Sequence, residues 1–395
     1  MASFYFTTHQ FMDKGELRVD FTSKITAKTN GQKRLFKVLK NPTPRIVGVF
    51  GPSGTGKSMI SLVYGIDSVL KGVYSKLVIS RPLVDVETSS ELTLLENSDT
   101  WLREMRGYLR DLVYRYIDLG VIEDLESKGK IVYVHPHLLR GRSFDGSLII
   151  MDDVQNVTPQ VITEIILRLG ENSRLIIIGD PILQARSENA AKQARSLLLG
   201  EIEGTEVVDM SLRDIVRPGA RLGIKLLLES HMRSRDLSET EREVYTTASR
   251  IAPDASIITV LDLRDLKEIW GITAEHVPDS IIVVKEGHLP RLIGSGGERI
   301  NKIEEETGLK IRGVELSLDF TGIVKAIHPV PWVHKHVRKT DLIGSDIVFV
   351  VSRDGIGAFI GQKGFYAKFI EEALKRLLGV GVRVEEPVPP KKKRG

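Results

Sequence analysis

Residues 51–58 read Gly51-Pro52-Ser53-Gly54-Thr55-Gly56-Lys57-Ser58 and fit the pattern G-x-x-x-x-G-K-[ST] at every constrained position. An apolar run precedes them and a helical pattern follows, which is the context this pattern requires. Glycines let backbone N–H groups converge on phosphate oxygens, and a helix N-terminus adds favourable dipole charge. In such a loop Lys57 reaches the β- and γ-phosphates, and Ser58 ligates Mg²⁺. We therefore expect all eight residues to bind a nucleoside triphosphate; the alternative is a glycine-rich turn with a surface lysine.

Short β-branched runs alternate with longer helical stretches on both sides of this loop, from Arg45 to about Asp209. The alternation is typical of parallel strands joined by crossover helices. The expected strands are Ile46–Phe50, Leu77–Ile79, Ile131–Val134, Leu148–Met151 and Leu175–Ile178, and the expected helices include Leu102–Tyr116 and one that begins near Pro159. The sequence thus predicts an α/β core with a parallel sheet and the loop at its carboxyl edge.

Polar side chains follow two of these expected strands. Asp152 and Asp153 come directly after an apolar run, where Asp152 would hold Mg²⁺ and Asp153 would orient or deprotonate the attacking water. An acidic helix N-cap is the alternative, because a helix starts soon afterwards. Asp180, with Gln184 nearby, follows the next run and would sense the γ-phosphate, although a simple turn also explains the glycine and proline beside it.

These segments together resemble the PhoH-like ATPases, which are relatives of the superfamily 1 helicases. The resemblance covers roughly residues 30–220 and is carried by the loop at 51–58, by Arg140-Gly141-Arg142 leading into Asp152-Asp153-Val154-Gln155-Asn156, by residues 179–184, and by Asp214-Ile215-Val216-Arg217. It implies that the nucleotide is ATP with Mg²⁺ and that Gln32 reads the adenine. It also implies that Arg217 stabilises transition-state charge, across a subunit interface if the chain forms a homo-oligomer; an ordinary surface ion pair is the alternative for Arg217.

The sequence departs from this family in two places. Asp153 stands where the family usually has Glu, which draws the carboxylate back by one methylene and affects water activation. The stretch 85–100 does not match the Gly- and Pro-rich segment that follows Arg81-Pro82 in the family, so no substrate contact is inferred there.

The C-terminal part repeats itself at an offset of 67 residues: Ile282-Val283-Val284 matches Phe349-Val350-Val351, and Ile293-Gly294 matches Ile360-Gly361. Each copy carries Gly-x-x-Gly between two helical patterns and resembles the KH signature, whose turn clamps about four nucleotides of a single strand. The expected RNA-binding residues are Arg291, Gly294, Ser295, Gly296, Gly297, Arg299, Gly361, Gln362, Lys363 and Gly364. A purely structural helix turn is the alternative for either copy alone, and its recurrence favours the RNA interpretation.

Composition sets the limits of these predictions. A chain of 395 residues exceeds one ordinary core, and we expect an ATPase domain at 1–235, a linker at 236–278, KH-like modules at 279–340 and 345–386, and a basic disordered tail at 387–395. The absence of cysteine excludes disulfides and thiolate metal sites. No apolar run approaches the roughly 18 residues that a membrane span needs, so we expect no membrane partner and a cytoplasmic location. The charge of +4 permits a polyanionic partner without requiring one.

Three functions agree with these features. The first is an ATPase that remodels single-stranded RNA, as a helicase does. The second is an RNA-binding switch whose ATP turnover controls grip without strand separation. The third, a small-molecule kinase with RNA-binding modules, is disfavoured because a kinase has no evident need for the polar groups at 152–155 and 180–184.

Overall fold

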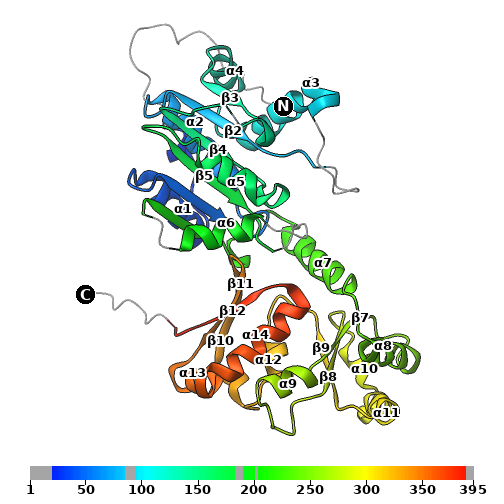
Figure 1. Ribbon diagram of the computed structural model, residues 1–395. Coiled ribbons are helices and arrows are strands. Elements are labelled where there is room, and N and C mark those ends of the chain that lie inside the picture. The colour runs from blue at the N-terminus through cyan, green and yellow to red at the C-terminus, as the bar shows by residue number, and fades with distance from the viewer. Residues whose placement is uncertain (1–19, 85–93, 140, 183–189, 201–202, 388–395) are drawn as a thin grey trace, which may run out of the picture.

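A computed structural model describes residues 20–84, 94–139, 141–182, 190–200 and 203–387. The predicted Gln184 and most of the predicted tail lie outside these residues. Figure 1 shows two halves joined by helix α7 (Ala220–Arg233), with the parallel sheet in the first half and two smaller sheets in the second. Among the described residues, no helix is both long enough and apolar enough to cross a membrane.

The first half contains the predicted parallel sheet, in the order β3-β2-β4-β5-β1-β6. Its strands are β3 (Ile131–Tyr133), β2 (Lys76–Ser80), β4 (Ser147–Met151), β5 (Arg174–Gly179), β1 (Ile46–Phe50) and β6 (Thr205–Asp209). Neighbouring strands pair in parallel throughout. The edge strand β6 was not predicted, because only Val208 of its five residues is fully buried and its composition is correspondingly polar.

Helices cover both faces of this sheet, because alternate residues of each strand point to opposite sides. The helices on one face are α1 (Asn30–Lys40), α2 (Lys57–Leu70), α3 (Leu94–Val113) and α4 (Leu119–Ser127), and those on the other are α5 (Pro159–Ile166) and α6 (Ala190–Leu199). Ile79, Ile150 and Ile178 belong to the first core, whereas Val78, Ile149 and Ile177 belong to the second. Because all six strands are parallel, their carboxyl ends lie at one edge of the sheet.

The second half holds two three-stranded sheets of the same design. The first is β7 (Ile257–Asp262), β8 (Ser280–Val284) and β9 (Ile311–Glu315), and the second is β10 (Val337–Ile343), β11 (Asp346–Val351) and β12 (Gly381–Glu385). In each sheet the first two strands are antiparallel and the last two are parallel. The helices of the first copy are α10 (Leu289–Ile293) and α11 (Glu298–Thr307), and those of the second are α13 (Arg353–Ile360) and α14 (Phe365–Leu378).

The segment 236–278, predicted to be a linker, is folded. It forms α8 (Glu239–Ile251), β7 and α9 (Arg264–Ile269), and β7 pairs with β8 inside the first small sheet. Its charge density misled the prediction, because Glu239, Arg242 and Glu243 lie on the outer side of an amphipathic helix that buries Val244 and Ala248, together with Glu241. Ser238 and Glu241 form a capping box that starts this helix.

The two repeats are not independent modules, since one hydrophobic core runs through both. Ile281 of the first sheet and Phe349 of the second belong to this core, together with residues of α12 (Thr321–Ile327). Helix α7 adds Ile224, Leu228 and Met232, although it was expected to belong to the ATPase domain. The structural boundary between the halves therefore precedes α7.

The β10–β11 hairpin also contacts the first half directly. Gly344 donates to the carbonyl of Met210 at 3.4 Å, and Arg195 binds Asp209 and Asp346. The hairpin thus extends from the second half to β6, as Figure 1 shows.

Candidate active site

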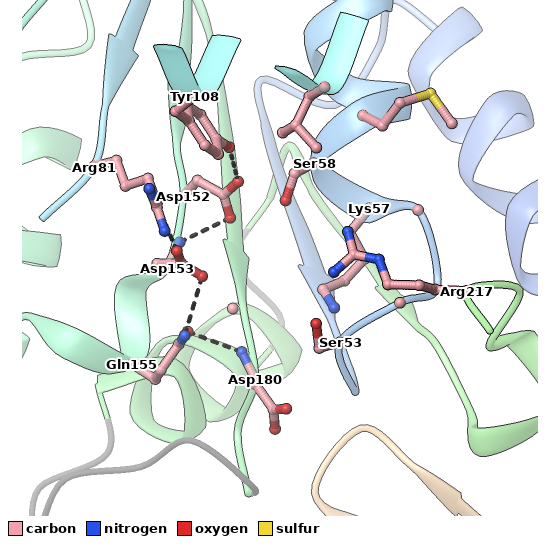
Figure 2. A pocket seen from close by; sticks show the side chains of 15 residues that line it. Ser53, Lys57, Ser58, Arg81, Tyr108, Asp152, Asp153, Gln155, Asp180 and Arg217 are labelled. Carbon is pink, nitrogen blue, oxygen red and sulfur yellow. Dashed lines mark hydrogen bonds and ion pairs between the residues drawn. The ribbon is translucent and has the colours of Figure 1, made fainter. Parts of the chain in front are cut away.

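A pocket lies at the carboxyl edge of the parallel sheet and joins the ends of β1, β4 and β5 (Figure 2). Most of the predicted nucleotide residues line it: Ser53, Gly54, Gly56, Lys57, Ser58, Asp152, Asp153, Asp180 and Arg217. Arg81, Tyr108 and Gln155 line it as well. The basic groups Lys57 and Arg217 lie on one side and the three aspartates on the other.

The loop between β1 and α2 needs glycine at two positions for steric reasons. Gly51 has a φ of +140°, and a Cβ there would lie 2.5 Å from the carbonyl oxygen of Met210. Gly54 has a φ of +83°, and a Cβ at this position would lie 2.7 Å from the Cβ of Ala220. These glycines let the loop pack against the segment that follows β6. The loop leads directly into the N-terminus of α2, where the helix dipole favours an anion.

Lys57 is buried, and its ammonium group turns back onto the loop. Nζ donates to the carbonyl of Gly51 at 2.7 Å and to that of Pro52 at 2.8 Å. Burial lowers the pKa of Lys57, and the charges of Asp180 and Asp152 oppose this shift. The two carbonyls bind the ammonium group of Lys57 in the position that phosphate oxygens of a bound nucleotide would take.

Asp152, at the end of β4, is only 2% exposed. Burial raises its pKa, and the neighbouring charge of Asp153 raises it further. The Tyr108 hydroxyl donates to one of its oxygens, and Ser58 also hydrogen-bonds this carboxyl. The two predicted Mg²⁺ ligands, Ser58 and Asp152, therefore meet. A buried carboxylate whose charged form is disfavoured, next to a second carboxylate, is a suitable environment for a divalent cation.

Asp153 adopts a left-handed conformation with a φ of 52°, which is uncommon for a residue other than glycine. Its Oδ2 lies 2.6 Å from Nε of Arg81, and its Oδ1 accepts from the Gln155 amide at 3.1 Å. Gln155 in turn accepts from the backbone N–H of Asp180 at 3.0 Å, which ties the ends of β4 and β5 together. The dashed lines in Figure 2 trace this network.

The sequence predictions did not assign roles to Arg81 and Tyr108. Arg81 directly follows β2, so the rule that ligands gather at the carboxyl ends of strands could have indicated it. Tyr108 projects from α3, and its position carried no such signal. The guanidinium of Arg81 lies over the Tyr108 ring, 4.4 Å from its centroid.

Four residues predicted for the nucleotide site, Gln32, Gly51, Pro52 and Thr55, are not among those that line this pocket. Gln32 is 3% exposed; its amide nitrogen donates to the Thr55 carbonyl at 2.9 Å, and its oxygen accepts from the Lys28 N–H at 2.8 Å. In this structure Gln32 therefore braces α1 against the loop. Gln184 lies outside the described residues.

The two Gly-x-x-Gly turns have the same backbone conformation. Gly294, Gly296 and Gly297 have φ values of 76°, 60° and 88°; the corresponding values at Gly361, Lys363 and Gly364 are 72°, 54° and 80°. The central residues Ser295, Gly296, Gln362 and Lys363 are all exposed. Lys363 keeps the left-handed conformation although it has a side chain, so the turn itself persists in both copies.

The basic residues around the first turn are partly engaged within the chain. Arg299 lies 2.5 Å from Asp254 and donates to the carbonyl of Arg291, while Arg291 itself contacts the Asp254 carbonyl at 3.3 Å. In the described part of the chain, no ion pair involves Lys363 of the second turn. The second turn therefore offers an anion the more accessible charge.

Known families match the first half of the chain and the first repeat of the second half. A family model described as PhoH-like protein matches residues 24–229, more than half of the chain, and one described as KH domain matches residues 280–318. The chain is 29% identical over 239 residues to a PhoH-like protein of Synechocystis sp., covering 58% of this chain and 69% of that relative. It is 30% identical over 200 residues to a PhoH-like protein of Bacillus subtilis, covering 49% and 60%. A structure of the Pif1 helicase from Candida albicans aligns with 65% of this chain and 63% of that chain at 13% identity, with a TM-score of 0.27.

Proposed function

Because the chain belongs to the PhoH-like protein family and contains a KH domain, we propose that it is an Mg²⁺-dependent ATPase that acts on single-stranded RNA. One observation carries the ATPase proposal. A buried lysine at the start of α2 faces Asp152, Asp153 and Asp180 across one pocket at the carboxyl edge of a parallel sheet. This arrangement separates a phosphate-binding side from a side suited to metal and water.

Each group has a role that follows from its position. Lys57 exchanges its contacts with the loop carbonyls for phosphate oxygens, and Arg217 approaches from the same side to offset charge that develops in the transition state. Ser58 and Asp152 would hold Mg²⁺, which neutralises phosphate charge. Asp153 lines the same pocket and would orient a water molecule once its ion pair with Arg81 is broken.

The RNA assignment rests on the two exposed Gly-x-x-Gly turns. The glycines at both ends of each turn carry no side chain, which lets a sugar–phosphate backbone approach closely, as KH domains require. The KH match ends at residue 318, so the assignment of the second turn depends on its matching dihedral angles and on Lys363.

A second candidate is an RNA-binding switch that hydrolyses ATP without separating strands. The contact between Arg81 and Asp153 favours it, because a guanidinium bound to the water-activating carboxylate slows turnover until some event breaks the contact. Both candidates require that RNA changes the ATPase rate.

Phosphate release by the full chain should be measured with single-stranded RNA, single-stranded DNA and duplex RNA, with Lys57→Ala as the background control. RNA-stimulated release together with strand displacement would support remodelling, and stimulation without displacement would support the switch. An RNA-independent rate with transfer of phosphate to a metabolite would point to a kinase. A parent rate equal to that of Lys57→Ala would overturn the ATPase proposal.

A further inference from the structure

Two adjoining cavities run along the junction between the halves, away from the nucleotide pocket. The first is bounded by Leu212, Arg213 and Arg221 on one side and by Asp319 and residues 337–341 on the other. The second continues from Arg213, Lys339 and Asp341 to Lys28 and Arg34 at α1. The two cavities share these three residues, so they form one groove, which we call the junction groove.

The charges of the junction groove are arranged so that cations face outward. Its basic residues are Lys28, Arg34, Arg213, Arg221, Arg338 and Lys339; all are exposed except Lys339, which is partly buried. Asp341 is 3% exposed and accepts from the Leu212 N–H, and Asp214 is 5% exposed and accepts from the Gly31 N–H. Asp319 is held by Thr321 and Thr340. Internal donors thus hold these three carboxylates in place, although Asp319 itself is exposed.

Most of these cations are not neutralised. Arg213 and Lys339 share the single carboxylate of Asp341, at 3.3 and 3.5 Å. Arg221 contacts a backbone carbonyl, and within the described ranges neither Arg221 nor Arg338 forms an ion pair. Cations gathered in a groove repel one another, and a polyanion that displaces their counterions removes this repulsion.

We propose that the junction groove binds the sugar–phosphate backbone of single-stranded RNA on its passage between the KH half and the ATPase half. This inference rests on the proposed function and extends it to a second contact surface. Among the described residues, no aromatic side chain lines either cavity, so contacts with phosphate rather than stacking on aromatic rings would dominate binding. Binding in the groove is therefore independent of RNA sequence.

The length of the RNA distinguishes binding in the groove from binding at the Gly-x-x-Gly turns. A tetranucleotide fills one Gly-x-x-Gly turn, whereas an oligonucleotide of about 20 nucleotides also reaches the groove. The test variant is Arg221→Ala with Arg338→Ala. The matched control is Arg115→Ala with Lys128→Ala, which removes the same charge at the far end of the first half, near α4 (Figure 1). Arg221→Lys with Arg338→Lys keeps the charge and should restore binding. Thermal unfolding checks that each variant is folded.

Fluorescence anisotropy with labelled oligouridine and oligoadenosine should give the following result. The alanine variant binds the long strands on the order of tenfold more weakly at 0.1 M salt, with a log–log salt slope smaller by about 1.4, since each lost phosphate contact removes about 0.7. The affinity of the alanine variant for the tetranucleotide is unchanged. The control variant binds strands of both lengths as tightly as the parent does.

Other outcomes overturn the inference in distinguishable ways. Unchanged affinity of the alanine variant for the long strands removes the groove as an RNA site but leaves the proposed function standing. Equal losses for short and long strands mean a general loss of charge attraction. A loss of ATP affinity in place of RNA affinity makes the groove part of the nucleotide site. If the parent binds neither length, the proposed function itself fails.

Discussion

Arg81 and Asp153 form an ion pair in which Nε lies 2.6 Å from Oδ2, although they come from the ends of different strands. Arg81 also stacks on Tyr108, whose hydroxyl donates to Asp152, so one arginine is linked to two of the three acidic groups of the site. A carboxylate bound to a guanidinium is a weaker proton acceptor and is less available to water. The pair therefore opposes the role proposed for Asp153.

Arg81→Gln should raise the ATPase rate measured without RNA. Both partners are about a quarter exposed, so the pair contributes no more than about 1 kcal/mol, which corresponds to an increase of up to about fivefold. The ratio of RNA-stimulated to basal rate should fall. Arg115→Gln, the same change away from the site, serves as the control. A slower basal rate with unchanged ATP affinity would instead make Arg81 a residue that positions Asp153 for catalysis.

Lys57→Ala should abolish hydrolysis, because no other buried cation reaches the phosphate side of the pocket from the loop. The rate of phosphate release at saturating ATP is the measurement, and Lys57→Arg tests whether charge alone is sufficient. Turnover within tenfold of the parent would reject the role of Lys57.

Asp153→Ala should keep ATP binding and lose turnover, because we assign this carboxylate to water and the neighbouring Asp152 to the metal. Equilibrium binding of a labelled nucleotide and single-turnover hydrolysis separate the two effects. Asp153→Glu, which restores the longer side chain usual in the family, is the conservative comparison. A loss of nucleotide affinity as large as the loss of rate would assign Asp153 to Mg²⁺ instead.

The features that the sequence predicted are those whose signal is local. The loop at 51–58 and the carboxylates after β4 each depend on a few adjacent residues, and five of the six strands of the parallel sheet are apolar runs in the sequence. Strand β6 was missed because an edge strand needs little apolar surface. Tyr108 was missed because only the packing of α3 against β4 brings it to Asp152. The folded segment 236–278 was read as a linker because surface charge hides a narrow buried stripe.

Asp341 connects the second repeat to the segment that runs from β6 to α7. It accepts from the Leu212 N–H at 3.1 Å, and the same segment donates from Val216 and Arg217 to the Gly54 carbonyl in the phosphate loop. Movement of the β10–β11 hairpin therefore acts on a segment that touches the nucleotide site. Asp341→Asn keeps an acceptor for Leu212 but removes the charge that holds Arg213.

We expect Asp341→Asn to reduce the effect of nucleotide on RNA affinity. RNA dissociation constants with and without a non-hydrolysable ATP analogue give this effect as a ratio, and reciprocity requires the same ratio when analogue affinity is measured with and without RNA. In the variant both ratios should move toward one. Ratios equal to those of the parent would show that the two halves communicate by another route.

The paired variant Gly296→Asp and Lys363→Asp tests the two turns as the RNA grip. Each substitution puts a carboxylate where phosphate is expected to lie. Aspartate suits both positions, since it tolerates left-handed backbone and a Cβ at Gly296 meets no atom within 4 Å. RNA binding should weaken, with a shallower salt slope because fewer counterions are released. The RNA concentration for half-maximal ATPase stimulation should rise in parallel.

Gly296→Asn with Lys363→Asn is the matched control, because it has nearly the same shape and backbone preference but adds no negative charge. A carboxylate effect beyond this control belongs to electrostatic repulsion of phosphate, whereas equal effects would mean that loss of the Lys363 charge or a disturbed turn, and not repulsion, weakens binding. Testing each turn separately then ranks them, and the Lys363 change should cost more because Arg299 near the first turn is already paired with Asp254. If a folded aspartate variant binds single-stranded RNA as tightly as the parent, these turns are not the RNA grip, and assembly or protein interaction becomes their better explanation.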